Sequence, residues 1–223
     1  MNVERFFDLE KTICNRLIEA AEYPWDVAEM LCEYIYRVGK GLKKSLYREV
    51  ERGIWIANSA TVSDEARICA PVIIGRESRV GRHASISGGA VIGDGALVGN
   101  GSEIRTSILF DGARAAQNNY VNDSILGAGA VLGMGAIITS LSSGSGRITV
   151  CLGKDALICE RERFGALVGD GALVGCSSIL SAGSVVERGA RVNPLVRASG
   201  FISAAKPDGK SRASLTAIIC DML

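Results

Sequence analysis

The sequence is poor in aromatic residues, in proline and in net charge. Aromatic residues make up 5% of the 223 residues, and only 4 residues are proline. With so few aromatic side chains, a fold built around a large aromatic core is not expected. The formal net charge is +1, so no global electrostatic field draws the chain to nucleic acid or to an anionic membrane. We therefore expect neither nucleic acid nor a membrane as a partner.

Long hydrophobic runs and paired cysteines are missing as well. No apolar run approaches the roughly 20 residues of a membrane-spanning helix, and the first residues, MNVERFFDLEK, do not resemble a signal peptide. The 7 cysteines are odd in number and scattered, and no CxxC pair occurs. This usage is typical of reduced thiols in a cytoplasmic protein and predicts no metal site.

Glycine, by contrast, is abundant, and it occurs within a regular rhythm. The chain has 27 glycines, well above the average share of about 7%. The stretch RVGRHASISGGAVIGDGALVGNGSEI returns to an aliphatic residue every six positions, with a small residue directly after it. Helices repeat near 3.6 residues and strands at 2, so neither accounts for this spacing. The aliphatic positions of the first run are Ile56, Val62, Ile68, Ile74, Val80, Ile86, Ile92, Val98 and Ile104.

A six-residue rhythm predicts a parallel β-helix of hexapeptide repeats, in which three short strands form one coil and each aliphatic side chain points inward. The rhythm slips by one residue near Leu109 and again near Leu126, and it resumes from Val168 to Val192. We therefore expect the β-helix over residues 53–196, with a loop inserted at 141–164. Within this loop, RITVCL and ALICE flank Gly153, Lys154 and Asp155 and predict a hairpin.

The two ends of the chain differ from the repeat. Residues 1–52 carry helical patterns, with Asp8 placed as an N-cap and Pro24 placed in the first turn of a second helix. We expect this region to form a helical cap packed against the first coil. Residues 197–223 form a C-terminal tail in which the polar stretch KPDGKSR precedes the apolar SLTAIICDML.

The stretch SEIRTSILFDGARAAQNNYVNDSILGAGAVLGMGAI, residues 102–137, resembles the C-terminal acetyltransferase region of sugar-1-phosphate nucleotidyltransferases. The resemblance is to the N-acetylglucosamine-1-phosphate uridyltransferase and archaeal thymidylyltransferase types. It implies an all-β solenoid, namely a left-handed parallel β-helix, assembled as a homotrimer with acetyl-CoA sites between subunits. The nucleotidyltransferase domain of that family has no counterpart here, so nucleotidyl transfer by this chain alone is not expected.

The resemblance also implies site residues. In that family a histidine deprotonates the amino group of an amino-sugar phosphate, and its motif K-A-x-H-L-x-Y-x-G-D falls on residues 114–123. Gln117 takes the place of the histidine, whereas Tyr120 and Asp123 match the motif. A glutamine can hydrogen-bond but cannot act as a base.

The phosphate-binding positions of the family are altered too. Arg105 replaces the family's lysine conservatively, whereas its phosphate-binding arginine falls on Ser87. The candidate substrate-binding residues are therefore Arg105, Asn119, Tyr120 and Asp123.

Three residues could replace the missing base. His83 is the only histidine, and it is either a substitute base or an ordinary surface histidine. Asp111 and Asp123 are the alternatives, because an aspartate becomes a useful base when it is desolvated. Both could equally be solvated corner residues.

These observations leave three hypotheses for the function. The first is a trimeric acyltransferase of the amino-sugar type with an altered site, using acetyl-CoA and a sugar phosphate. The second is a non-catalytic subunit that partners a separate nucleotidyltransferase. The third is a module that binds a nucleotide sugar or CoA without turnover.

Overall fold

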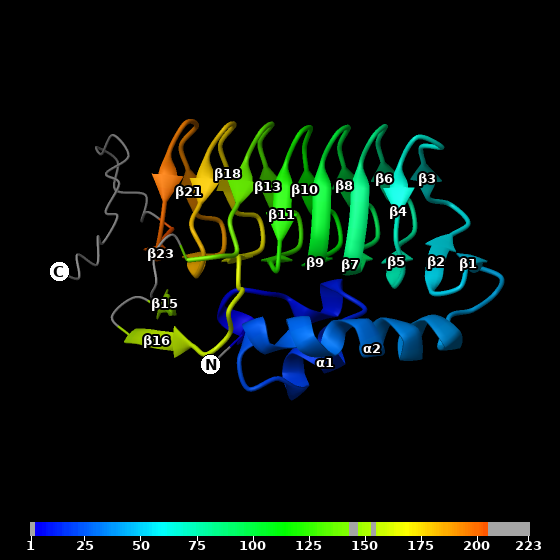
Figure 1. The fold of residues 1–223 in the computed structure, drawn as a ribbon, viewed down its shortest axis with the longest axis horizontal. Coiled ribbons are helices and arrows are strands. Elements are labelled where there is room, and N and C mark those ends of the chain that lie inside the picture. The colour runs from blue at the N-terminus through cyan, green and yellow to red at the C-terminus, as the bar shows by residue number, and fades with distance from the viewer. Residues whose placement is uncertain (1–2, 143–146, 153–154, 205–223) are drawn as a thin grey trace.

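The computed structural model describes residues 3–142, 147–152 and 155–204. Its body is a parallel β-solenoid whose coils follow one another along the long axis of the molecule (Figure 1). Each complete coil contributes one strand to each of three walls, which we number 1, 2 and 3 in the order in which the chain passes through them. The parallel β-helix predicted from the six-residue rhythm is confirmed.

Wall 1 is a 7-stranded parallel sheet. Its strands are β3 (Thr61–Val62), β6 (Arg79–Val80), β8 (Leu97–Val98), β10 (Arg114–Ala115), β13 (Val131–Leu132), β18 (Leu173–Val174) and β21 (Arg191–Val192).

Walls 2 and 3 together form a 14-stranded sheet, because β7 (Ser85–Ile92) and β9 (Glu103–Leu109) run through the corner between them. The other strands of wall 2 are β4 (Arg67–Ile68), β11 (Tyr120–Asn122), β14 (Ile137–Ile138), β19 (Ile179–Leu180) and β22 (Arg197–Ala198). Those of wall 3 are β2 (Ile54–Ala57), β5 (Val72–Ile74), β12 (Ile125–Leu126), β17 (Ala166–Val168), β20 (Ser184–Val186) and β23 (Phe201–Ile202). Before the first coil, β1 (Tyr47–Glu51) pairs antiparallel with β2.

The aliphatic residues of the rhythm form the core of the solenoid. Ile74, Ile92 and Leu132 have no exposed surface, and Val174 is 3% exposed. Each side chain packs on its equivalents in the coils on either side, so burial is shared between nearest neighbours. This confirms the inward direction that the spacing predicts.

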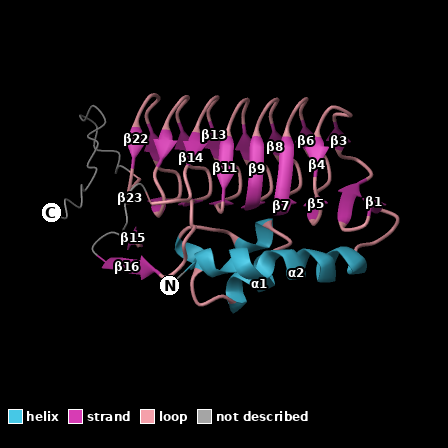
Figure 2. Ribbon diagram, in the orientation of Figure 1, coloured by secondary structure: helices cyan, strands magenta, loops and turns pink. Residues whose placement is uncertain are grey.

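A layer of helices covers wall 3 along its length (Figure 2). It consists of three 3-10 helices, η1 (Val3–Arg5), η2 (Leu9–Lys11) and η3 (Pro24–Asp26), and of two α-helices, α1 (Asn15–Ala20) and α2 (Val27–Gly41). The side chain of Asp8 caps η2, and Pro24 opens the turn before α2, as their positions in the sequence predict. Within the described residues, neither α-helix is long and apolar enough to span a membrane.

The position of this layer corrects the expectation that the helices cap the first coil. They lie along the side of the solenoid because wall 3 carries an outward row of apolar residues that needs a cover. This row packs in one cluster with the helices and consists of Trp55, Ile73, Val91, Ile108, Ile125, Leu167 and Val185. Near the end of α2, Gly39 leaves no room for a side chain, because a Cβ there would collide with the ring of Trp55.

The first residues of the chain contact its last coils. Arg5 forms an ion pair of 2.7 Å with Glu187. The backbone N–H of Asp8 donates to Oδ2 of Asp170 at 2.6 Å, and the N–H of Asp170 donates to the carbonyl of Phe6 at 3.0 Å. The N-terminal segment therefore starts at the C-terminal coils and ends at the first coil, where α2 meets Trp55.

The inserted loop contains the hairpin that the sequence predicts. Strands β15 (Ile148–Leu152) and β16 (Asp155–Cys159) pair antiparallel. Ile148 and Val150 are buried in the same apolar cluster as the helices, and β15 lies over β20 and β23 of wall 3. The hairpin thus extends the helical layer toward the C-terminal coils. Gly153 and Lys154, expected at its turn, lie outside the described residues.

The solenoid continues beyond residue 196, its expected end, since β22 and β23 pair in parallel with β19 and β20. Part of the expected tail, residues 197–202, thus belongs to the walls. The rest of it, from residue 205, lies outside the described residues.

Candidate functional site: a cleft at the corner between walls 2 and 3

The two slips in the rhythm both shorten the corner between walls 2 and 3. Where no slip lies between two coils, equivalent residues such as Arg76 and Asp94 are 18 positions apart, whereas Ser107 and Ser124, which have a slip between them, are 17 apart. The shortened corners are formed by Thr106 and Asp123, which have positive φ angles of 46° and 47°. Positive φ is rare for residues with side chains, so these corners are strained turns.

Serine hydroxyls close these two turns. Ser107 Oγ donates to the carbonyl of Arg105 at 2.7 Å, and Ser124 Oγ donates to that of Asn122 at 2.6 Å. Ser107 Oγ also accepts the backbone N–H of Ser124 at 3.1 Å, which links one corner to the next. These contacts fix the backbone on both sides of Asp123.

The inserted loop leaves and re-enters the solenoid at this same corner. The N–H of Phe164 donates to the carbonyl of Ser140 at 3.0 Å, and that of Gly165 donates to the carbonyl of Asp123 at 2.9 Å. A Cβ at Gly165 would collide with Ser124 Oγ and with the carbonyl oxygen of Asn122. Glycine is therefore needed where the chain returns beside Asp123.

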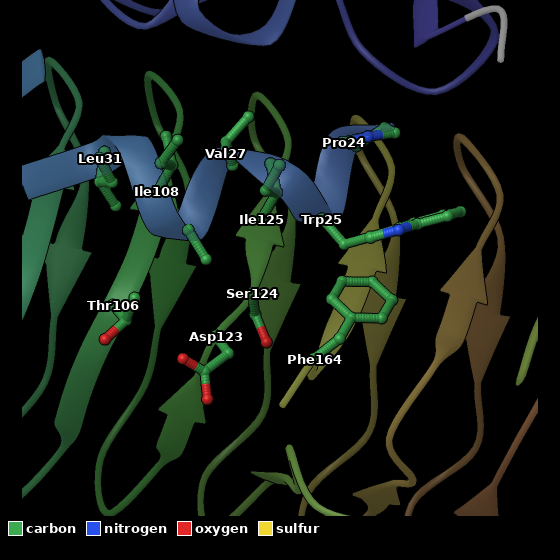
Figure 3. Close-up of a pocket in the computed structure, with 11 residues that line it drawn as sticks. Pro24, Trp25, Val27, Leu31, Thr106, Ile108, Asp123, Ser124, Ile125 and Phe164 are labelled. Carbon is green, nitrogen blue, oxygen red and sulfur yellow. The ribbon is translucent and has the colours of Figure 1, made fainter. Parts of the chain in front are cut away.

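Behind the corner lies a small apolar pocket beneath the start of α2 (Figure 3). The rings of Trp25 and Phe164 pack with their centroids 5.5 Å apart. Thr106, Asp123 and Ser124 provide its polar edge. Figure 3 shows these polar side chains on the solenoid below the helix, away from the apolar side chains of α2.

A separate cleft of about 580 Å³ lies at the same corner and shares Ala28, Thr106 and Asp123 with the pocket. This volume lies within the usual range of small-molecule sites, about 300–1,000 Å³. The cleft is lined by Asp26, Ala28, Glu29, Thr106, Asp123, Glu160, Arg161, Glu162 and Arg163. Arg161 holds the loop against α2, because its Nε donates to Asp26 Oδ1 at 2.9 Å and it also pairs with Glu29.

Asp123 is the residue of this cleft with the most unusual environment. Burial raises the pKa of its carboxyl group, while a hydrogen bond with Ser140 and the charges of Arg163 and Arg105 oppose that rise. Its Oδ2 atom is buried and has no hydrogen-bond partner among the described residues. A carboxylate oxygen in this state can accept a proton or bind a cation.

Two other sequence-predicted residues lie on wall 2 near this corner. Arg105 is exposed on β9, and its charge acts on Asp123. Tyr120 is half-buried on β11, where its hydroxyl accepts a hydrogen bond of 3.3 Å from Nδ2 of Asn122.

Asn119, which the sequence predicts to bind substrate, lies at the corner between walls 1 and 2. Its side chain is buried, and its Nδ2 donates to the carbonyls of Gly133 at 2.6 Å and Ala136 at 3.2 Å. Its backbone N–H donates to Ser102 Oγ at 3.0 Å. The side-chain amide thus joins its coil to the next one, in addition to the backbone hydrogen bonds that the same two carbonyls accept.

The three candidate bases lie at three different corners. His83 is at the corner between walls 1 and 2, with its side chain 77% exposed and paired with Glu65 at 3.2 Å. Asp111 is at the corner between walls 3 and 1, where its Oδ1 accepts the N–H of Asp94 at 2.8 Å, and burial raises the pKa of its carboxyl group. Asp123 alone is in the cleft. The structure therefore does not bring these residues together.

Gln117 lies at the same corner as His83. Its side chain is exposed, and its backbone carbonyl accepts the N–H of Gly135 at 2.9 Å. It therefore does not face the cleft of Asp123 within one chain. In the part of the chain that the structure describes, no group of three or more His, Cys, Asp or Glu side chains is placed to hold a metal ion.

Sequence reasoning missed the residues that complete the cleft and the pocket behind it. Arg161 and Arg163 of the cleft, and Trp25 and Phe164 of the pocket, come from the helical region and from the inserted loop, far apart in the sequence. The signal available was the position of the two slips, which mark the corner from which the loop departs.

Residues 68–164 match the family model described as the GMPPB C-terminal domain. The matched stretch runs from wall 2 of the first coil to Phe164 and includes Arg105, Gln117 and Asp123. This confirms the resemblance to the C-terminal hexapeptide-repeat region of sugar nucleotidyltransferases over this part of the chain. No curated protein sequence matches the chain.

Among solved structures, the chain is similar to a hexapeptide transferase family protein from Anaplasma phagocytophilum. The identity is 25%, the match covers 64% of this chain and 74% of that one, and the TM-score is 0.47. It is also similar to a mutant of perosamine N-acetyltransferase from Caulobacter crescentus, solved with CoA and GDP-perosamine. There the identity is 22% over 66% of this chain and 53% of that one, about half its length, with a TM-score of 0.28.

Proposed function

We propose that the chain is a homotrimeric, cytoplasmic acyltransferase-like protein that transfers an acetyl group from acetyl-CoA to an amino-sugar phosphate. The observation that carries the proposal is the family match over residues 68–164, the stretch that contains the corner cleft with Asp123. The volume of the cleft suits a sugar phosphate, and Arg163 on its wall with Arg105 nearby suits the phosphate group.

In this proposal the acyl thioester supplies an electrophilic carbonyl carbon. The protein has to orient an amine toward that carbon and accept the proton which the amine loses. The acyl donor fits walls 1 and 2, which the helices leave uncovered and which a second copy can reach. Exposed arginines on wall 1 suit the phosphates of CoA, and these are Arg79, Arg114 and Arg191.

The altered positions predict slow turnover. Gln117 cannot accept a proton, and general-base assistance is typically worth about 10²–10⁴-fold in rate. Ser87 supplies no charge at the family's arginine position. We therefore expect Gln117→His alone to restore little activity and Gln117→His with Ser87→Arg to restore more.

Release of free CoA in the presence of acetyl-CoA and a panel of amino-sugar phosphates tests the proposal. Amine-dependent release that rises in the double variant supports it. If neither the natural chain nor the double variant releases CoA with any amine, the protein is not an acyltransferase of this type.

A second function is favoured by the identity of the matched family. Because residues 68–164 match the C-terminal domain of a nucleotidyltransferase, the chain could instead partner a separate nucleotidyltransferase without catalysis of its own. Mixing the chain with such an enzyme tests this alternative. A stable complex with changed nucleotidyl-transfer kinetics, together with no CoA release, would favour it over the first proposal.

A further inference from the structure

We propose that the cleft at Asp123 binds the amino group of the acceptor, and that Asp123, rather than Gln117 or His83, accepts its proton. The transfer step rests on the proposed function above, whereas the binding of an amine at this carboxylate can be tested without any acyl donor.

One oxygen of the Asp123 carboxyl group is unsatisfied. Oδ2 is buried without a partner among the described residues, although buried polar atoms are nearly always hydrogen-bonded. The other part of the carboxyl group is held by Ser140, and the turn is fixed by Ser124. The unpartnered oxygen therefore lies just beneath the wall of the cleft, where a small rotation of the Asp123 side chain would present it to a donor on a ligand.

The charges around the cleft favour an ammonium group at Asp123. The carboxylates of Asp26 and Glu29 on the helical side are already paired with Arg161. Asp123 is the cleft carboxylate that carries a buried, unpartnered oxygen, so an ammonium group gains most by binding there. The titratable groups of the elements that line the cleft or act on Asp123 are Asp26, Glu29, Arg105, Glu160, Arg161, Glu162 and Arg163.

Two arginines near Asp123 suit a ligand that carries a negative charge apart from its ammonium group. Arg105 and Arg163 both act electrostatically on Asp123 from exposed positions, from β9 and from the inserted loop. An acceptor with an ammonium group at one end and a phosphate at the other matches an acidic centre flanked by two arginines. Neither His83 nor Gln117 has such surroundings, since His83 is paired with Glu65 and Gln117 is exposed at another corner.

The ammonium form of the acceptor gives one proton to the carboxylate of Asp123, and the free amine attacks the carbonyl carbon of the acyl thioester. A C–N bond forms, and the C–S bond breaks when the tetrahedral intermediate collapses. The nitrogen loses its second proton in this step, and the leaving thiolate takes up one proton. The products are an amide and a thiol.

Binding without an acyl donor gives the first test. Calorimetric titration compares glucosamine 1-phosphate with glucose 1-phosphate, which has a hydroxyl group in place of the ammonium group. A hydrogen bond to a charged partner predicts that the natural chain binds the amino compound about 10-fold or more tightly. In Asp123→Asn the preference should fall below about 3-fold, whereas Asp64→Asn, an exposed control, should keep it.

The titration tests the amine site independently of acyl transfer. An equal preference in Asp123→Asn and in the natural chain, or no preference in the natural chain, would overturn the inference. A preference that depends on Asp123 would support the amine site even if no acyl transfer occurs, and in that case the proposed function fails while the site stands.

The pH dependence of turnover tests the proton transfer. Because burial raises the pKa of Asp123, kcat/KM should fall toward acid pH with an apparent pKa above the ordinary aspartate value of 3.8. Asp123→Asn should lower kcat/KM by about 10²–10⁴-fold and remove this limb, while the affinity for acetyl-CoA stays the same. Full turnover in Asp123→Asn would show that another group is the base and would leave the proposed function intact.

Discussion

Asn119 and Gln117 are two residues apart and have opposite roles. The amide of Asn119 is buried and joins two coils, whereas that of Gln117 is exposed at a corner. The difference follows from their places in the coil, because the residue before each strand of wall 2 lies inside the corner. A motif match alone cannot distinguish the two.

Replacing Asn119 by Ala should destabilise the fold without a specific effect on ligands. The change removes two hydrogen bonds and leaves the carbonyls of Gly133 and Ala136 without this donor. We expect the free energy of unfolding to fall by about 1–3 kcal/mol in urea denaturation. The neighbouring Gln117→Ala should change it by less than about 0.5 kcal/mol. Equal losses in the two variants would contradict the structural role of Asn119.

Asp123 should make the folded protein less stable as the pH rises. Its carboxyl pKa is raised by burial, so between 3.8 and that raised pKa the folded state binds more protons than the unfolded state. Stability is therefore gained as pH falls through this window and lost as pH rises through it. Asp123→Asn removes this dependence and should raise the free energy of unfolding at pH 7, by less than about 1 kcal/mol after solvent screening. Thermal melts between pH 4 and pH 7 measure it, and a lower melting temperature in the variant at pH 7 would contradict it.

At the scale of elements, helix α2 and wall 3 depend on each other. The wall supplies an outward apolar row, and the helix supplies a face that approaches closely at Gly39. Neither element could bury its apolar surface alone.

Gly39→Ala tests this close approach. Alanine favours helix by about 1 kcal/mol, but a Cβ at this position collides with Trp55, so the helix would have to shift. We expect a net loss of about 1–3 kcal/mol in unfolding free energy. Gly41→Ala is the matched control, since nothing lies within 4 Å of a Cβ there, and it should be neutral or stabilising. A stabilised Gly39→Ala protein would show that the helix does not rest on Trp55.

The elements also show how much the sequence could predict. The rhythm from Ile56 to Ile104 predicts the walls and the buried residues, because a six-residue spacing with small residues has one simple geometric solution. It does not predict where α2 lies, since the outward positions Ile73 and Val91 look like ordinary strand residues until the row is seen in three dimensions. The cleft could not be predicted from the sequence either, because its lining comes from segments that only the folded chain brings together.

At the scale of the molecule, the uncovered walls 1 and 2 predict assembly. Met134, Ile137 and Leu195 are 53%, 37% and 82% exposed and lie on walls and corners that no helix covers. Exposed apolar residues on one side of a solenoid are typical of an interface between subunits.

Sedimentation equilibrium should therefore give a mass three times that of the 23.4 kDa chain. Ile137→Lys should weaken the assembly by at least about 10-fold, because it would place a charge in the contact. Val50→Lys on β1 is the control and should leave the mass unchanged. A monomer at micromolar concentration would refute the trimer, and a dimer would show that another surface, such as the inserted loop, makes the contact.

The contacts of Arg5 and Asp8 with the late coils restrict when this segment can dock on the solenoid. A stack of repeats would ordinarily fold as it leaves the ribosome, since each new coil needs only the previous one. Here Asp8 and Arg5 have their partners at Asp170 and Glu187, more than 160 residues later. Arg5 and Asp8 can therefore reach their final contacts only after these late coils have formed, whereas α2 can pack earlier, because its partners β5, β7 and β9 precede residue 110. Docking of the N-terminal segment is thus a late step that the stacking of coils alone does not require.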